Sequence, residues 1–336
     1  MTEEMSLPRF IEIAVNLGDS VFRGVYHGKQ KHPDDLEHVL QRAEDAHVKA
    51  QVITAGSLAE TREALDLTNL RPYMYCTAGS HPTRSDELFS HPGGPSAYIQ
   101  DLRNLIDSHT HAREGGKIVA VGECGLDYDR IHFASKETQQ SAFELQLNLA
   151  QETNLPLFLH SRAAHSDFVR LLRPHLAKLR QNSNANEEPS RVEPGCVGVV
   201  HSFTGTTDEL NELLELGLYV GVNGCSLKTQ ENLDMVREIP LHRIMLETDA
   251  PWCDLRPTHA SAAFLGQFRK EEPHLAQRYS PLRLKPERWN ASAAVKGRNE
   301  PCNIGEVAAV VARLHNISLQ ELAEHAFRNA TRLFRL

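Results

Sequence analysis

The stretch IVAVGE, residues 118–123, is a short apolar run that ends on a carboxylate. Three later runs have the same form: PLFLH ends at His160, GVVH at His201 and RIMLETD at Asp249. They are continuously apolar, as expected of parallel strands buried on both faces. Because parallel strands of one sheet end at the same edge, we expect Glu123, His160, His201 and Asp249 to meet there.

The same alternation of strand and helix runs through the whole chain. Eight strands alternating with helices predict a TIM (β/α)8 barrel, an α/β fold of typically about 250 residues. A doubly wound open sheet is the main alternative, but no G-x-G-x-x-G follows the first strand. The strands are expected to begin near residues 9, 49, 73, 117, 155, 196, 218 and 243, and the helices to cover 33–47, 58–67, 95–113, 136–153, 165–180, 207–216, 229–237, 304–314 and 319–333.

Composition and charge narrow the classes of function. The 336 residues, 40% hydrophobic and 24% charged, can build one large domain or two small ones, and we predict a single barrel domain over 1–336. The apolar runs are far shorter than the roughly 20 residues of a membrane-spanning helix. The start MTEEMSLPRF lacks the features of a signal peptide. We therefore expect an intracellular protein, of the cytoplasm or the nucleus, with no membrane partner and no protein partner that can be inferred.

The cysteines and the net charge exclude further classes. Six cysteines lie far apart without a C-x-x-C pair, which predicts reduced thiols rather than a disulfide framework or a zinc finger. The net charge of −8 argues against wholesale attachment to nucleic acid or anionic lipid. A polyanionic substrate would require a local basic region.

Two segments depart from the regular alternation. The polar segment 181–195 precedes a strand and is expected to be a surface insertion on the face away from catalysis. The segment 251–301 follows the eighth strand and is expected to be a long basic loop on the catalytic face. With the loop after the first strand it would form a basic lip, which comprises Arg23, Lys29, Lys31, Arg278, Arg283, Lys285, Arg288, Lys296 and Arg298.

The residue types at the strand ends predict a metal site. Carboxylate and imidazole groups together bind divalent cations, and a carboxylate can bridge two of them. Glu123, His160, His201 and Asp249 are the predicted ligands, and His81 and Asn16 occupy the corresponding positions on two other strands. Glu247 shares a strand end with Asp249, and Asp249 is favoured because it lies further along the chain toward the active-site end.

Five motifs in order resemble a known family. The strings AVGECGLDYDR, FLHSRAAH, VVHSFTGT, ETDAPW and GRNEP are similar to those of TatD-type, metal-dependent deoxyribonucleases, which have amidohydrolase-like barrels. The segment KPERW through RNEPCNI looks most like the eukaryotic branch. The resemblance implies hydrolysis of DNA phosphodiesters by a 3′ to 5′ exonuclease with a divalent cation, Mg²⁺ first and Zn²⁺ or Mn²⁺ as alternatives.

The resemblance also implies residue roles. Glu123 would be shared by two cations, His160 and His201 would complete one site, and Asp249 would serve the other. Asp249 could also accept the proton of the attacking water. His81 would bind the phosphate or the leaving oxygen, and the guanidinium groups of Arg162 and Arg298 match phosphate geometry.

The first strand departs from the family pattern. Many members begin with D-x-H-x-H, whereas this chain has Glu12, Ala14 and Asn16 at those places. One metal site is therefore expected to be weaker, so that one or two cations bind per chain. Two alternatives stay open: a barrel hydrolase of aminoacyl ester or amide substrates, and a catalytically weak metal-binding scaffold.

Overall fold

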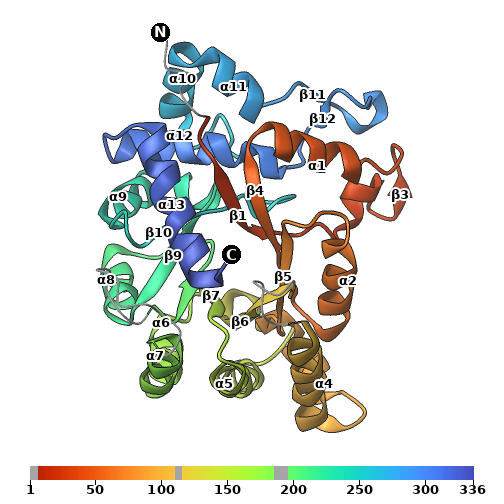
Figure 1. Cartoon of the computed structure of the whole chain (residues 1–336), viewed down its shortest axis with the longest axis vertical. Coiled ribbons are helices and arrows are strands. Elements are labelled where there is room, and N and C mark those ends of the chain that lie inside the picture. The colour runs from red at the N-terminus through yellow and green to blue at the C-terminus, as the bar shows by residue number, and fades with distance from the viewer. Residues whose placement is uncertain (1–6, 110–115, 185–195) are drawn as a thin grey trace. The chain divides into compact units, whose positions relative to one another are not determined.

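Eight strands form one sheet in a computed structural model of the chain, which describes residues 7–109, 116–184 and 196–336. The strands follow the order β1, β4, β5, β6, β7, β8, β9 and β10 (Figure 1). The first and last lie side by side, because Val15 bridges Ala250 and the amide of Asp249 donates to the carbonyl of Ala14. The sheet is thus a nearly closed parallel barrel, and the predicted TIM-barrel fold is confirmed.

The strands are short and buried, as the continuous apolar runs predicted. Valine, isoleucine and leucine side chains along them are buried, and parallel pairing needs helices to cover the outer face. Their bounds are β1 (Phe10–Val15), β4 (Val48–Ile53), β5 (Met74–Ala78), β6 (Ile118–Asp127), β7 (Leu157–Arg162), β8 (Gly198–Val200), β9 (Leu218–Val222) and β10 (Ile244–Leu246).

Thirteen α-helices connect or follow these strands in the described part of the chain. Helix α8 shows how local sequence starts one: the Thr206 hydroxyl caps the Glu209 amide, and the Glu209 carboxylate returns to the Thr206 amide. The helices are α1 (Leu36–Asp45), α2 (Leu58–Thr68), α3 (Ser85–Phe89), α4 (Gly94–His109), α5 (Lys136–Thr153), α6 (His165–Leu172), α7 (Leu176–Asn184), α8 (Thr207–Glu215), α9 (Gln230–Glu238), α10 (Ala262–Glu271), α11 (Pro273–Tyr279), α12 (Ile304–Leu314) and α13 (Leu319–Phe334). None of these helices combines the length and apolar character needed to cross a bilayer.

Two sequence-based expectations about the elements need correction, and a third is only partly described. The helix predicted over 165–180 is divided into α6 and α7 by a 3-10 turn at Arg173–His175, where proline has no amide hydrogen to donate. The segment 251–301 is not a plain loop, since it contains α10 and α11. It also contains the short strands β11 (Arg283–Leu284) and β12 (Ala294–Val295). Of the predicted insertion 181–195, α7 covers the first residues, and 185–195 lie outside the described residues.

The chain divides into two compact units. One consists of Met1–Gln51 and Val222–Asn329, and the other of Val52–Gly221 and Ala330–Leu336. Within the second unit, α2 packs against β5 and α5 packs against β6 (Figure 1). We call the unit of Met1–Gln51 and Val222–Asn329 the terminal unit, and the unit of Val52–Gly221 and Ala330–Leu336 the central unit. The single domain predicted over 1–336 stays a prediction.

Candidate metal centre

Three imidazole rings surround one carboxylate oxygen in the central unit. The Oε1 atom of Glu123 lies 2.7 Å from Nε2 of His201, 2.9 Å from Nδ1 of His160 and 3.4 Å from Nε2 of His81. Glu123 and His160 belong to β6 and β7, His201 directly follows β8, and His81 lies three residues after the end of β5. Four consecutive strands of the sheet thus bring together four of the residues that the strand ends predicted.

An irregularity in β6 directs Glu123 into this cluster. Val121 pairs with Leu157 and Cys124 pairs with Leu159, so β6 carries one extra residue against β7. Such a bulge redirects a side chain that regular alternation would place elsewhere. The neighbouring glycines permit it: a Cβ added at Gly122 would lie 2.1 Å from the Phe158 carbonyl oxygen.

The charges of the cluster depend on one another. Burial alone would raise the pKa of Glu123, but His201, His81 and hydrogen bonds from the rings hold it well below its usual range. Burial lowers the pKa of His81 to about 4. Burial also opposes the charged form of His160, but contacts with Asp127 and Glu123 raise its pKa above the usual value. At neutral pH the cluster therefore holds an ionised Glu123 and an uncharged His81.

The hydrogen bonds of His81 define its tautomer. The amide of Thr83 donates to Nδ1 of His81 at 3.2 Å, and the Thr83 hydroxyl lies 2.7 Å from the same nitrogen. Because a backbone amide can only donate, Nδ1 is the acceptor and the proton of the neutral ring is on Nε2. His81 thus presents an N–H donor toward Glu123, as a group that binds an anionic oxygen would.

The donor set fits a divalent cation. Glu123 and His160 each offer a ligand atom, within 4.8 Å of each other, and His81 lies beside them as a hydrogen-bond donor. The 3.4 Å between Nδ1 of His160 and Nε2 of His201 also matches the roughly 3.4 Å between two nitrogens bound at about 2.1 Å to one tetrahedral ion. The predicted ligands Glu123, His160 and His201 are therefore brought together in a geometry that suits a metal.

Asp127 is a member of this site that the sequence reasoning missed. Its Oδ2 atom lies 3.4 Å from Nε2 of His160, the ring nitrogen that faces away from Glu123, and 3.5 Å from Nη1 of Arg162. Carboxylates behind a metal-binding histidine orient its ring and raise its basicity. The available signal was the motif GECGLD, in which a second acid follows Glu123 by four residues.

Arg162 lies at the end of β7 beside Asp127. Its side chain is 45% exposed, and its ion pair with Asp127 is long, at 3.5 Å. This placement leaves the guanidinium accessible to a phosphate near the cluster. The predicted phosphate contact of Arg162 is compatible with this geometry and stays a prediction.

Asp249 lies in the terminal unit and is held by two donors. The side-chain amide of Asn16 donates to its Oδ1 atom at 2.9 Å, and the Cys253 thiol donates to its Oδ2 atom at 3.2 Å. Glu12 is fully buried and accepts the amides of Ala14 and Thr248. Asn16 therefore orients Asp249 directly, while Glu12 anchors the backbone just before it.

Glu247 and Asp249 differ in solvent exposure, in the direction expected if Asp249 rather than Glu247 is the metal ligand. Glu247 is fully buried and accepts the side-chain amide of Asn223 at 2.9 Å, whereas Asp249 is partly exposed. Asp249 is the one of the two that solvent can reach. Its role as ligand and proton acceptor stays a prediction.

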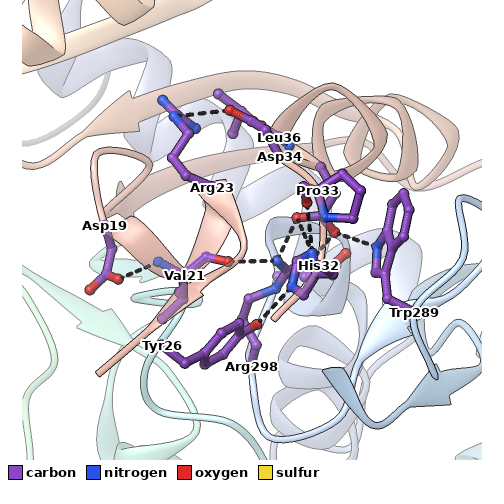
Figure 2. Close-up of polar contacts among 12 residues, drawn as sticks. Asp19, Val21, Arg23, Tyr26, His32, Pro33, Asp34, Leu36, Trp289 and Arg298 are labelled. Carbon is purple, nitrogen blue, oxygen red and sulfur yellow. Dashed lines mark hydrogen bonds and ion pairs between the residues drawn. The ribbon is translucent and has the colours of Figure 1, made fainter. Parts of the chain in front are cut away.

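Arg298 is placed differently from the sequence-based expectation. It is only 1% exposed, and its guanidinium donates to both carboxylate oxygens of Asp35 at 2.7 Å and to Glu300 at 2.8 Å. Figure 2 shows it directed toward the segment that carries Val21 and His32, and the Val21 carbonyl accepts a further bond at 3.1 Å. A guanidinium committed in this way supports the fold of the terminal unit, which argues against direct phosphate contact.

The fold and the cluster together define a class of protein, the amidohydrolase-like barrel hydrolases with imidazole and carboxylate groups at the strand ends. Residues 25–335 match the family of TatD related DNases, and the chain belongs to this family. It is 43% identical to the deoxyribonuclease Tat-D of Schizosaccharomyces pombe, over 97% of this chain and 95% of that protein.

Further relatives agree with this assignment. The chain is 35% identical to a 3′-5′ ssDNA/RNA exonuclease TatD of Erwinia tasmaniensis, over 90% of this chain and 94% of that protein. Among solved structures, an uncharacterized amidohydrolase from Saccharomyces cerevisiae superposes with a TM-score of 0.85 at 33% identity, covering 97% of this chain and 99% of that one.

Proposed function

We propose that this chain is a metal-dependent nuclease that removes nucleotides from the 3′ end of DNA. The observation that carries the proposal is the Glu123 carboxylate enclosed by three imidazoles, in a chain of the TatD-related DNase family. The deoxyribonuclease and exonuclease names of its relatives support DNA as the substrate.

The cation would be held by Glu123, His160 and His201. A bound divalent cation neutralises phosphate charge and lowers the pKa of a water ligand from 15.7 toward neutrality. The imidazole-rich donor set of this cluster suits Mn²⁺ or Zn²⁺ better than Mg²⁺, which prefers oxygen ligands. We therefore propose that this cluster binds Mn²⁺ or Zn²⁺. Mg²⁺ is the alternative, and the metal assay below distinguishes them.

The protein's own residues supply binding and proton transfer. His81 would donate a hydrogen bond from its Nε2–H group to a phosphate oxygen or to the leaving oxygen, because its lowered pKa keeps the ring neutral and Thr83 fixes the tautomer. Arg162 would neutralise a second phosphate oxygen. Asp249 is the proposed proton acceptor, since a half-exposed carboxylate held by Asn16 suits general-base work.

Exposed basic residues of the terminal unit would attract the strand. Lys31 pairs with Glu287 at 3.4 Å, so the loop after β1 and the segment around Pro286–Arg288 lie next to each other. Lys29, Lys285, Arg288 and Lys296 are also exposed there. They form the solvent-facing part of the basic lip. Arg298 is not part of it, because its side chain is buried. An intracellular location, in cytoplasm or nucleus, is proposed with this function.

The deciding experiment follows the shortening of a 5′-labelled single-stranded DNA with Mg²⁺, Mn²⁺ or Zn²⁺ added separately. Digestion from the 3′ end gives a ladder of labelled products that shortens stepwise, and a blocked 3′ end should stop it. Glu123→Gln and His201→Asn should lower the rate by at least about a hundredfold, whereas Glu63→Gln, an exposed site on α2, should not. A wild type that releases no nucleotide with any of these ions contradicts the proposal.

A further inference from the structure

Two cysteines of the terminal unit lie with their sulfur atoms in contact. The Sγ atoms of Cys225 and Cys253 are 3.0 Å apart, and both residues are partly exposed. Cys225 begins the 3-10 turn after β9, and Cys253 lies in the loop after β10. By contrast, the thiols of Cys76, Cys124 and Cys302 are buried. This pair takes no part in the nuclease chemistry proposed above.

The backbone on both sides holds the two sulfurs at this separation. A Cβ added at Gly224 would lie 2.0 Å from the Cys253 carbonyl oxygen, so the two segments touch at that point and only glycine permits it. The Cys225 amide donates to Asn223 at 2.9 Å, and the side chain of Asn299 donates to the Trp252 carbonyl at 2.8 Å. The sulfur pair is therefore preorganised by its surroundings.

The separation of the sulfurs distinguishes two chemistries. Two thiolates bound to one tetrahedral zinc ion at about 2.3 Å would lie roughly 3.8 Å apart, which is farther than the 3.0 Å observed. A disulfide bond of about 2.05 Å needs the sulfurs to approach by only about 1 Å from the observed 3.0 Å. The geometry thus favours a disulfide over a shared metal ion.

We propose that Cys225 and Cys253 are a redox modification site that forms a reversible intramolecular disulfide with low-molecular-weight disulfides such as glutathione disulfide. One cysteine thiolate attacks the glutathione disulfide and releases one glutathione as its thiol. The second cysteine thiolate then attacks the mixed disulfide and releases the other glutathione. Two protein thiols are oxidised and one glutathione disulfide is reduced to two thiols, so electrons and protons balance.

The modification has a direct local consequence. The Cys253 thiol donates to Oδ2 of Asp249 at 3.2 Å, and a disulfide sulfur has no hydrogen to donate. Oxidation would therefore remove this donor from Asp249, while the side chain of Asn16 still donates at 2.9 Å. Thiol oxidation would in this way reach a residue of the proposed catalytic machinery.

The test uses the full chain equilibrated in glutathione buffers of graded oxidation, quenched with a maleimide and digested for peptide mass analysis. We expect the loss of two reactive thiols per chain, together with a linked peptide pair carrying Cys225 and Cys253 that dithiothreitol separates. Cys253→Ser should stop the reaction at a glutathione adduct on Cys225. Cys196→Ser, at another partly exposed cysteine, should leave the linked peptide unchanged.

Three results would overturn the proposal. The first is that both thiols react with the maleimide at every buffer ratio. The second is that glutathione adducts form in the wild type but never resolve into the linked peptide. The third is that bound zinc, which a chelator releases, protects both thiols. None of these measurements depends on nuclease activity, so failure here is distinguishable from failure of the proposed function.

Discussion

Glu123 and Asp127 lie on the same strand, β6, and have complementary roles in the site. Glu123 faces three imidazole nitrogens, while Asp127 faces the outer nitrogen of His160 and the guanidinium of Arg162. A negative charge behind His160 makes its Nδ1 lone pair a better metal ligand. At the residue scale, the site thus consists of a carboxylate that binds and a carboxylate that orients.

Replacing Asp127 by asparagine tests the orienting role. Asp127→Asn keeps the shape and can still accept the Asp129 amide, but it removes the charge beside His160. We expect the affinity for Mn²⁺, measured by titration calorimetry, to fall by about 10- to 100-fold. Asp129→Asn, at the exposed residue two positions along, is the matched control and should leave the affinity unchanged. Equal affinities for both variants would refute an orienting role.

The pKa of His160 predicts how metal affinity depends on pH. Metal binding needs a deprotonated ring nitrogen, and hydrogen bonds to Asp127 and Glu123 offset burial and raise the pKa of His160 above its usual value. Protons therefore compete with the metal ion for His160 at a higher pH than they would for an ordinary histidine. As pH falls below that raised pKa, Mn²⁺ affinity should drop by about tenfold per unit, and above it the affinity should be constant.

Calorimetry in buffers of different ionisation enthalpy checks this pH dependence. Binding should release at least one proton per chain on the acidic side and none on the alkaline side. His81 should not contribute, because its lowered pKa of about 4 keeps it neutral throughout the range from about pH 5.5 to 8.5. An affinity that is flat down to pH 5.5 would contradict the assignment of His160 as a ligand.

At the element scale, strand β6 depends on a glycine at Gly125. Gly125 pairs with His160, has φ 141°, and a Cβ added there would lie 1.9 Å from the His160 carbonyl oxygen. The close approach of β6 to β7 therefore excludes any side chain at this position. The same contact sets where His160 lies relative to Glu123.

Gly125→Ala should destabilise the protein and damage the site. The unfavourable φ and the steric overlap should together lower the free energy of unfolding by about 2–5 kcal/mol, with loss of Mn²⁺ binding in the fraction that stays folded. Gly266→Ala is the control, because Gly266 lies inside α10 with no atom within 4 Å of its added Cβ. It should raise the stability by about 0.5–1 kcal/mol. Urea unfolding of both variants gives the comparison.

Local pattern predicted the elements and the strand-end residues but not their irregularities. The structure brings His160 and His201 together near the ends of parallel strands, as the apolar runs predicted, whereas Glu123 lies within β6 and reaches the cluster through a bulge. Asp127 was missed because β6 continues through a bulge and the polar sequence ECGLD, which lacks strand periodicity. Helices α10 and α11 were missed because their segment is rich in charge and proline, although Leu265 and Phe268 are buried.

At the scale of the whole molecule, distant parts of the sequence build the terminal unit together. Arg298 binds Asp35, which is 263 residues earlier, and Arg42 binds Glu300 at 2.6 Å. The indole of Trp289 adds a bond to Asp35 at 3.1 Å. No local pattern can reveal such partners, which is why the GRNEP motif suggested phosphate contact. The burial of Arg298 became evident only from the folded chain.

Replacing Arg298 separates the structural role from phosphate binding. Arg298→Met removes one cation from a buried cluster and leaves the carboxylates of Asp35 and Glu300 without it. Removing one member of a buried ion pair costs about 3–5 kcal/mol, so thermal and urea unfolding should show a loss of that size. The affinity for Mn²⁺ and the KM for single-stranded DNA should both stay within about twofold, since the guanidinium of Arg298 is buried and bonded to Asp35 and Glu300.

The matched control is Lys296→Gln, at an exposed cation two residues earlier in the same segment. It should change stability by no more than about 0.5 kcal/mol, and any effect it has should be on the salt dependence of DNA binding, because exposed cations act on the phosphate backbone through long-range charge. If Arg298→Met instead left stability intact and raised KM by tenfold or more, Arg298 would be a phosphate ligand. The ion-pair cluster of the terminal unit would then have to open when DNA binds.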